Sequence, residues 1–284
     1  MTRNNPLSRA ERLAPPVLLT VAGFDPSSGA GITADLAVFS AFGGFGVSCI
    51  TGLTVQSTTG VAGVEAVPAA TVRATLACLA ADLPLAGIKI GMLATAENVR
   101  IVDGFCAVNR TVPTVLDPVW RSSSGRDLLD SAGTAVLREK LLGNVGWITP
   151  NLDELGMLTG TAVRTAEDVP AAARRLLAQA QDLGNPGLQV VVTGGHLESA
   201  SDFLLSGTME VWIPGERVET TATHGTGCAF SSALLAGLVL HPERGPLEQV
   251  IAAKNYVRRA LETAVPIGRG RGPMNLLWPL CSAE

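Results

Sequence analysis

The stretch Val17-Leu18-Leu19-Thr20-Val21-Ala22 decides the fold of this chain, because its continuous apolar character predicts a strand buried on both faces. The turn Asp25-Pro26-Ser27-Ser28-Gly29 follows it. After the turn, the apolar residues Ile32, Leu36 and Phe39 recur at the spacing of one helix face. The chain therefore opens with a strand, a turn and a helix, which together are typical of α/β proteins.

The same alternation continues to the end of the chain. Further strands are predicted at residues 47–55, 87–90, 114–117, 146–149 and 188–192, with a hairpin formed by 203–205 and 209–213. Helices are predicted at residues 72–83, 96–108, 153–158, 169–183, 227–240 and 246–264. This order indicates an α/β fold in which helices cover both faces of a mostly parallel central sheet.

A single domain is expected at residues 16–268. A chain of 284 residues can bury one large core, and no linker, low-complexity tract or internal repeat divides the sequence. The polar segment 1–15 is predicted to be a flexible tail, and residues 269–284 a loosely packed end.

The composition argues against several classes of protein. The net charge is −4 without a long basic run, so nothing indicates a nucleic acid or an anionic membrane as partner. The longest apolar run, 228–240, is too short to span a bilayer. The cysteines form no Cys-x-x-Cys pair, which argues against a disulfide framework or zinc cluster, and Cys49, Cys78 and Cys106 are predicted to be packing residues. We therefore expect a cytoplasmic protein.

Ligands of parallel sheets bind at the carboxyl ends of the strands, and the loops expected there are rich in glycine and polar residues. The segment His224-Gly225-Thr226-Gly227-Cys228 opens an apolar helix, so free backbone N–H groups and the positive end of a helix dipole would meet there. That geometry suits a phosphate. Cys228 would lie in the first helical turn, where the same field is expected to lower the pKa of the thiol.

Six ordered segments carry a family resemblance: AGFDPSSGAGITADL (22–36), TVQST (54–58), IKIGML (88–93), LDPV (116–119), TPNLDE (149–154) and HGTGC (224–228). On these segments the chain, from Leu18 to about Gly268, resembles the hydroxymethylpyrimidine/phosphomethylpyrimidine kinases of thiamine biosynthesis. They are part of the ribokinase-like superfamily. The resemblance implies a three-layer sandwich, phosphorylation of 4-amino-5-hydroxymethyl-2-methylpyrimidine and of its monophosphate by ATP, and a homodimer.

The resemblance also implies a substrate pocket. Asp35 and Gln56 match the positions that hold the amino group and ring nitrogens of the pyrimidine. A carboxylate accepts hydrogen bonds and a carboxamide both donates and accepts them, which suits an aminopyrimidine edge. Gly23, Met92 and Val119 match positions that line the rest of the pocket, although plain core packing is the alternative for Met92 and Val119.

On the nucleotide side, Asn151 and Glu154 match the Asn-x-x-Glu motif, which in the family holds Mg²⁺ and phosphate through water. Asp117 is expected to share in this metal or phosphate network. The turn Gly225-Thr226-Gly227 is the expected phosphate cradle, because the sequence lacks a Walker-type motif. Cys228 stands where most ribokinase relatives have the Asp that accepts the substrate's hydroxyl proton, so it is the expected catalytic base.

Two departures from the family pattern bear on activity. Thr193 replaces the lysine of Lys-Gly-Gly-His, which contacts the transferred phosphate in relatives; Gly195 lies in the same phosphate-binding loop. Losing that cation could cost about 10²-fold in rate. Arg121 or Arg126 is the hypothesised replacement, from the loop 120–126 where relatives often carry a lysine, and solvated loop charges are the alternative.

Three other functions stay open at this point. Some pyridoxal kinases of the same superfamily also carry the cysteine, but Gln56 and the absence of a cysteine from residues 120–126 favour the pyrimidine. A non-catalytic pyrimidine-binding relative would account for Thr193. A thiol hydrolase built on Cys228 and His224 is disfavoured, because the sequence shows no acid that would orient the histidine.

Overall fold

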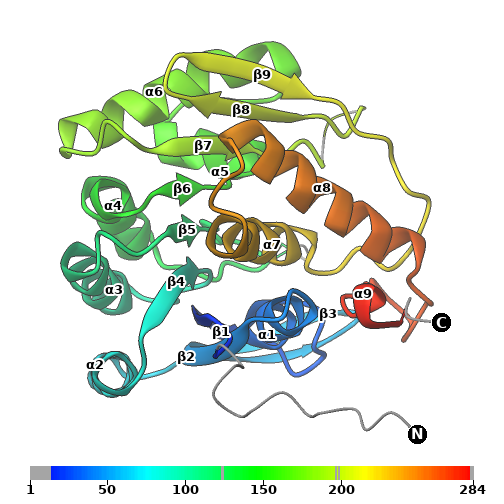
Figure 1. The fold of residues 1–284 in the computed structure, drawn as a ribbon, viewed down its shortest axis with the longest axis horizontal. Coiled ribbons are helices and arrows are strands. Elements are labelled where there is room, and N and C mark those ends of the chain that lie inside the picture. Colours follow the sequence, from blue (N-terminus) through cyan, green and yellow to red (C-terminus); the bar gives the residue numbers. More distant parts are fainter. Residues whose placement is uncertain (1–13, 123–124, 196, 198, 282–284) are drawn as a thin grey trace, which may run out of the picture.

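The computed structural model describes residues 14–122, 125–195, 197 and 199–281, and these form one nine-stranded sheet (Figure 1). The strands are β1 (Val17–Phe24), β2 (Phe45–Ser57), β3 (Gly60–Ala66), β4 (Leu85–Ile90), β5 (Thr114–Leu116), β6 (Trp147–Ile148), β7 (Gln189–Val192), β8 (Asp202–Ser206) and β9 (Met209–Ile213). Their order across the sheet is β3-β2-β1-β4-β5-β6-β7-β8-β9. β3, β8 and β9 pair antiparallel and the other pairings are parallel.

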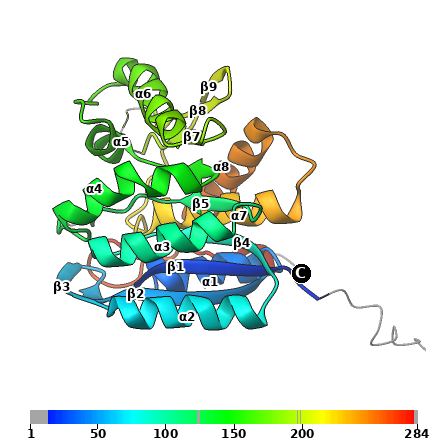
Figure 2. The same ribbon diagram turned by 90° about the vertical axis from the view of Figure 1, so that its left-hand side faces the viewer.

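Helices cover both faces of the sheet (Figures 1 and 2). One face carries α1 (Gly31–Ala41), α7 (Thr226–Leu240), α8 (Pro246–Glu262) and the short α9 (Trp278–Cys281). The other face carries α2 (Ala69–Asp82), α3 (Ala96–Val108), α4 (Ser131–Glu139), α5 (Leu152–Thr159) and α6 (Val169–Asp182). The three-layer α/β sandwich predicted from the sequence is confirmed.

Alternate residues of the central strands belong to two separate cores. In β1, Leu19 and Val21 pack with the α2 and α3 side of the sheet, whereas Leu18 packs with α1 and α7. In β5, Leu116 packs on the α2 and α3 side, whereas Val115 packs on the α1 and α7 side. Successive side chains of a strand point to opposite faces, so a strand covered on both sides needs an unbroken apolar run.

The predicted strands and helices are all present, with ends that shift by a few residues. The sequence did not predict β3, α4 or α9. Strand β3 contains Gly60 and Gly63 and is largely exposed, so it has no apolar run. Helix α4 carries only Val136 and Leu137 as larger apolar side chains, and its start is marked by Asp130, whose side chain caps the N–H of Gly133.

Part of the C-terminal segment, expected to be loosely packed over residues 269–284, packs onto the domain, and residues 282–284 lie outside the described residues. Met274 and Leu276 are buried. The hydroxyl of Tyr256 on α8 donates to the carbonyl oxygen of Leu276, and the indole of Trp278 donates to the carbonyl of Tyr256 at 3.3 Å. Of the predicted tail 1–15, only Ala14 and Pro15 fall within the described residues.

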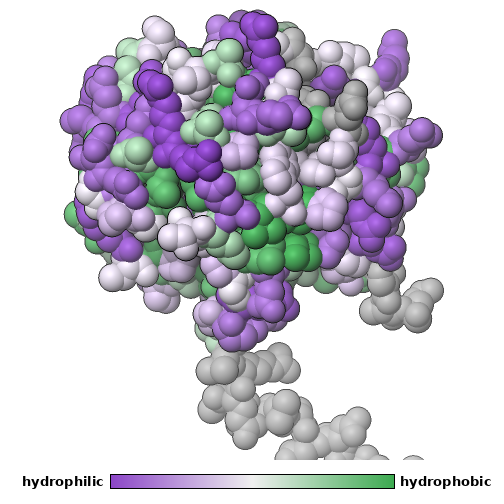
Figure 3. Space-filling view, turned by 90° about the horizontal axis from the view of Figure 1, so that it is seen from above, coloured by the Kyte–Doolittle hydropathy of each residue, from purple (hydrophilic) through white to green (hydrophobic). Residues whose placement is uncertain are grey.

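The cysteines whose side chains are described are all free. Cys49 and Cys106 are buried as expected, but Cys78 is exposed, because it lies on the outer side of α2. Within the part of the chain that the structure describes, no helix combines the length and apolar character needed to cross a membrane. Seen from above, the molecule is mostly hydrophilic, with apolar residues in smaller areas between (Figure 3).

Candidate active site

A cavity of about 910 Å³ lies where the parallel strands end, within the range of about 300–1,000 Å³ typical of small-molecule sites. It brings together most of the residues predicted from the sequence: Gly23, Gln56, Met92, Asp117, Val119, Arg121, Asn151, Glu154, Thr193, Gly195, Gly225, Thr226, Gly227 and Cys228. Asp35 is the predicted site residue that does not line it.

The N-termini of α1 and α7 meet at the wall of this cavity. Gly225, directly before α7, has a φ of 79°, and a Cβ atom there would overlap the carbonyl oxygen of Gly29 in the turn before α1. Glycine permits both the left-handed backbone and the close approach. The first N–H groups of each helix have no partner within their own helix, so two positive helix ends converge on one place.

Cys228, the third residue of α7, lies at this junction. The N–H of Gly31 donates a hydrogen bond to its sulfur, and its thiol bonds the carboxylate of Asp117. The predicted lowering of the thiol pKa is wrong for this structure. Burial raises the pKa of Cys228 to about 12; Lys89 opposes the rise, and Asp117 and Asp35 add to it.

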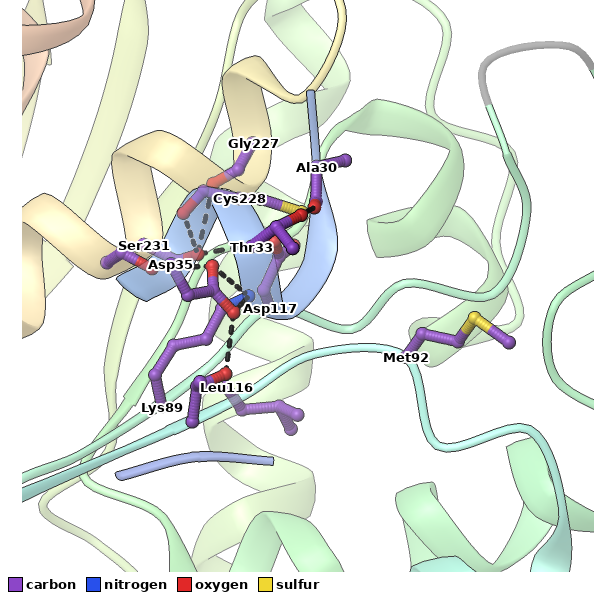
Figure 4. A network of polar contacts seen from close by, with 12 residues as sticks. Ala30, Thr33, Asp35, Lys89, Met92, Leu116, Asp117, Gly227, Cys228 and Ser231 are labelled. Carbon is purple, nitrogen blue, oxygen red and sulfur yellow. Dashed lines mark hydrogen bonds and ion pairs between the residues drawn. The ribbon is translucent and has the colours of Figure 1, made fainter. Parts of the chain in front are cut away.

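A buried ion pair, Lys89–Asp35, lies close to Asp117 and Cys228 (Figure 4). Lys89 Nζ is 3.0 Å from both carboxylate oxygens of Asp35, and neither side chain is exposed. The hydroxyls of Thr20 and Ser232 donate to the same carboxylate at 2.6 and 2.7 Å. Burial alone would lower the pKa of Lys89, but Asp35 and two further acidic groups raise it, so the lysine is a cation.

This geometry corrects the assignment of Asp35 to the pyrimidine edge. The inward face of α1 directs the carboxylate at β1, β4 and α7, away from the cavity, and its oxygens are engaged by Lys89, Thr20 and Ser232. In this structure Asp35 holds the Lys89 cation close to Cys228 and Asp117 (Figure 4).

Asp25, His224 and Gln56 form a second polar cluster. Nε2 of His224 lies 2.7 Å from Oδ2 of Asp25 and 2.8 Å from the side-chain amide of Gln56. Burial alone would raise the pKa of Asp25, but hydrogen bonds from His224 and Ser27 lower it below its usual value. His224 thus has the acidic partner that the sequence did not show. Its Nε2 faces Asp25 and Gln56, which gives no support to a Cys228–His224 hydrolase pair.

Asn151 and Glu154 form the capping box of α5: each backbone N–H donates to the other side chain at 2.9 Å. Glu154 and Asp117 are 5% and 4% exposed and both line the cavity. Burial, and then the charge of Asp117, raise the pKa of Glu154 well above its usual value, and burial likewise raises the pKa of Asp117.

Two buried carboxylates that repel each other at a cavity wall fit a hydrated Mg²⁺, which takes one or two carboxylates and keeps several waters. No group of three or more His, Cys, Asp or Glu side chains among the described residues could hold a metal. Asp117 and Glu154 fit such an ion, which would take its other ligands from water and phosphate.

The phosphate-side loop follows β7. The N–H of Thr193 donates to the carbonyl of Pro150 at 2.9 Å, which places Thr193 and Gly195 on the cavity wall beside Asn151. His196, quoted with this loop in the sequence, lies outside the described residues.

The two candidate arginines differ in position. Arg121 lines the cavity, where its guanidinium stacks 4.2 Å from the ring centre of Trp120 and its Nε donates to Asp127 at 2.7 Å. Arg126 does not line the cavity, and its guanidinium donates to the carbonyl of Ala62 at 2.8 Å. Arg121 is therefore the one placed to meet a ligand.

Sequence reasoning missed three basic residues at this cavity: Lys89, Arg217 and Arg271. Lys89 had a signal, because a lone lysine between two isoleucines in a buried strand needs an anionic partner. Arg217 donates to the carbonyl oxygens of Leu197 and Gly195 at 2.7 and 3.4 Å. No local pattern marks Arg217 or Arg271, because both reach the cavity from loops distant in sequence.

The apolar part of the cavity contains Gly23, Met92 and Val119. A Cβ atom on Gly23 would lie 2.7 Å from Sδ of Met92, so the glycine makes room for that side chain. Met92 lies apart from the ion-pair network (Figure 4). Its side chain is 6% exposed and also lines the cavity, so it serves both the core and the pocket.

Comparisons with known proteins agree with this geometry. A model of the phosphomethylpyrimidine kinase family matches residues 25–275. A hydroxymethylpyrimidine/phosphomethylpyrimidine kinase of Rhizobium meliloti is 41% identical over 266 residues, covering 91% of this chain and 96% of the relative.

Two solved structures add fold similarity. The phosphomethylpyrimidine kinase of Clostridium difficile has a TM-score of 0.74 at 31% identity and covers 87% of this chain and 99% of that chain. A pyridoxal kinase of Staphylococcus aureus in complex with AMP-PCP and pyridoxal has a TM-score of 0.79 at 25% identity, covering 93% and 94%. The backbone thus resembles both kinds of kinase, whereas sequence identity is higher to the pyrimidine kinases.

Removing one partner of the buried ion pair should destabilise the protein by more than the pair contributes to stability, because the other charge is left buried without a partner. Lys89→Met leaves Asp35 unpaired and Asp35→Asn leaves Lys89 unpaired, so each should lower the free energy of unfolding by about 3–5 kcal/mol. The double variant should lose less than the sum of the two. Urea unfolding of the four proteins measures the coupling. Additive losses would show that the pair does not act as a unit.

Asp25 should stabilise the protein in a pH-dependent way. The pKa of its carboxyl group is lower in the folded protein than its ordinary value of 3.8, so its contribution to stability is present above that value and lost as the pH falls through the folded pKa. Asp25→Asn should lower the free energy of unfolding by about 1–3 kcal/mol near neutral pH. Denaturant unfolding at a series of pH values should show this gap shrinking in acid; a constant gap would contradict the assignment.

Proposed function

Because the chain belongs to the phosphomethylpyrimidine kinase family, we propose that it phosphorylates 4-amino-5-hydroxymethyl-2-methylpyrimidine, and then its monophosphate, with ATP in thiamine biosynthesis. The observation that carries this function is the junction of the α1 and α7 N-termini, with Cys228 between them and the carboxylates of Asp117 and Glu154 lining the same cavity. Phosphoryl transfer needs such convergent positive charge far more than covalent chemistry.

The cradle for the transferred phosphoryl group is the turn Gly225-Thr226-Gly227. Its backbone N–H groups lie in the first turn of α7, where they lack helical partners, and they face the cavity together with the start of α1. Thr193 and Gly195 bound the same region from the loop after β7. We assign the ATP phosphates to the space between these two loops.

The pyrimidine lies between Gln56, Met92 and Val119 in this proposal. Gln56 supplies the polar contact to the ring edge, and Met92 and Val119 give apolar contact to its faces. Gly23 leaves the space that Met92 fills. Asp35 acts through Lys89 and does not touch the ring.

Asp117 and Glu154 would hold Mg²⁺, partly through water, with Asn151 fixing the Glu154 side chain through the capping box. When bound, the ion supplies positive charge that neutralises the phosphate oxygens. A cation there would also offset the burial that raises the pKa of both carboxyl groups and, for Glu154, the added repulsion from Asp117.

Cys228 accepts the proton of the substrate hydroxyl. The hydroxyl oxygen bonds to the γ-phosphorus, the bond from that phosphorus to the ADP oxygen breaks, and the proton passes to the Cys228 sulfur. The thiolate form that accepts it is stabilised by the Lys89 cation and by the N–H of Gly31. In the free protein it is a minor species, because burial raises the pKa of Cys228 to about 12.

Pyridoxal is the second candidate substrate, since the backbone is as similar to a pyridoxal kinase as to a pyrimidine kinase. Turnover of pyridoxal in preference to both pyrimidines would move the protein to vitamin B6 metabolism. Tight pyrimidine binding without turnover would instead identify a non-catalytic relative, as the threonine at position 193 allows.

We also propose that the protein is a cytoplasmic homodimer that needs neither membrane nor nucleic acid. Phe45, Leu53 and Val55 of β2 are 52%, 44% and 67% exposed, which supports a surface covered by a second copy. Light scattering of the purified protein tests the dimer.

Removing the base should abolish most of the activity. Cys228→Ala should lower kcat by about 10²–10⁴-fold on the pyrimidine, because the hydroxyl proton loses its acceptor. A coupled ADP-release assay with Mg-ATP measures this. Cys78→Ala is the matched control, since Cys78 is exposed on α2 and does not line the cavity. Unchanged turnover in Cys228→Ala would remove the residue from the reaction.

Arg121 is the proposed substitute for the lysine missing at Thr193. Arg121→Ala should lower kcat by about 10²-fold, because a cation near the transferred phosphate is lost. Arg126→Ala is the control from the same loop and should leave kcat unchanged, since Arg126 points away to Ala62. Equal rates in both variants would show that Arg121 is a solvated loop charge.

A further inference from the structure

Asp25, His224 and Gln56 form a hydrogen-bonded chain along the cavity wall, although they come from the loop after β1, the residue pair before α7 and the end of β2. All three line the cavity. The catalytic scheme above uses only Gln56, so the other two residues are left without a role there.

The chemistry of Asp25 fixes the direction of this chain. The N–H groups of Ser27, Gly29 and Ala30 donate to its carboxylate at 2.8, 3.2 and 2.9 Å, and hydrogen bonding keeps its pKa low. An ionised carboxylate can only accept hydrogen bonds. Nε2 of His224, 2.7 Å from Oδ2 of Asp25, must therefore carry the proton of that bond.

A proton on Nε2 determines how the Gln56 amide is turned. The structure places Nε2 of Gln56 2.8 Å from Nε2 of His224, but two N–H donors do not bond to each other, so we turn the amide over. The carbonyl oxygen then takes this position and shares the single Nε2 proton of His224 with Asp25. The NH₂ group takes the opposite position, on a side chain that lines the cavity.

We propose that Asp25 and His224 are positioning residues that lock the Gln56 amide with its NH₂ group offered to the ligand as a donor. This inference rests on the proposed function and names the ring edge that the pocket selects. A 4-aminopyrimidine matches it: the ring nitrogen accepts from the NH₂ group, and the amino group donates to the second lone pair of the amide oxygen. A 4-oxopyrimidine offers a ring N–H and a carbonyl, which is the opposite polarity.

The packing around His224 makes the lock rigid. A Cβ atom on Gly29 would overlap Cδ2 of the imidazole, so the ring lies flush against the turn before α1. The backbone N–H of His224 donates to the carbonyl of Gly272 at 3.1 Å, and the side chain is 13% exposed. Turning the amide over to fit the oxo ring would break the bond to an imidazole that cannot move away.

The first test reads the proton directly and needs no ligand. Nitrogen-15 NMR of the protein labelled at histidine, with the His224 signals assigned by their loss in His224→Phe, should show Nε2 protonated at neutral pH. A bare Nε2, with the proton on Nδ1, would overturn the lock.

The second test measures selectivity by calorimetric binding of 4-amino-5-hydroxymethyl-2-methylpyrimidine and of its 4-oxo analogue. The wild type should prefer the amino ring by about 10²–10³-fold, because the oxo ring leaves buried donors facing donors. In His224→Phe the amide is free to turn, so the preference should fall below about tenfold. His241→Phe is the control, since His241 is an exposed residue after α7 outside the cavity, and it should keep the wild-type preference.

A His224→Phe protein that binds the amino ring and keeps the full preference would overturn the proposal. If that variant does not fold, Asp25→Asn serves instead: an asparagine can donate to Nε2, so the forced direction is lost and the preference should again fall. Failure of the wild type to bind either pyrimidine would overturn the proposed function, while the NMR result would still decide whether the lock exists.

Discussion

The site depends on the burial of one positive charge. Lys89 stands in a strand whose neighbours are apolar, and its ammonium group has no exposed surface. A cation in that position is tolerable only with a matched anion and further hydrogen bonds. Asp35 supplies the anion from α1, and Thr20 and Ser232 complete its shell from β1 and α7. Satisfying this one charge therefore draws β1, β4, α1 and α7 together under the cavity.

The same requirement explains why two helices begin at one point. With Asp35 on α1 and Ser232 on α7 bonded through the pair, the N-termini of these helices lie side by side, and Gly225 allows their turns to touch. Two helix ends and the Lys89 cation then surround Cys228 and the phosphate cradle. Asp117 contacts α7 through a hydrogen bond from Ser231 at 3.2 Å, and Glu154 lines the same cavity from the start of α5, so both signs of charge meet around the proposed phosphate site.

Related kinases with different substrates share this backbone, so selectivity must come from a few side chains at the ring edge. Gln56 is one of them, and an amide is ambiguous by nature because its two ends have nearly the same shape and opposite polarity. The contact with His224, and through it with Asp25, removes that ambiguity. In this proposal Gln56 touches the substrate, and Asp25 and His224 contribute to its selection by holding the Gln56 amide in one orientation.

The sequence alone determined the alternation of strands and helices and the sheet covered on both faces, because apolar periodicity and glycine turns such as Gly225 are local properties of the chain. The resemblance of its motifs to a known family supplied the site residues, and most of those lie in the cavity. The sequence missed α4 and β3, whose apolar residues are too few to make a pattern. Only the tertiary structure decided that Asp35 serves Lys89, that burial raises the pKa of Cys228, and that Asp25 faces His224. The partners of a buried charge or hydrogen-bonding group are the groups that lie next to it in the folded chain. These can be distant in sequence, as Asp25 and His224 are.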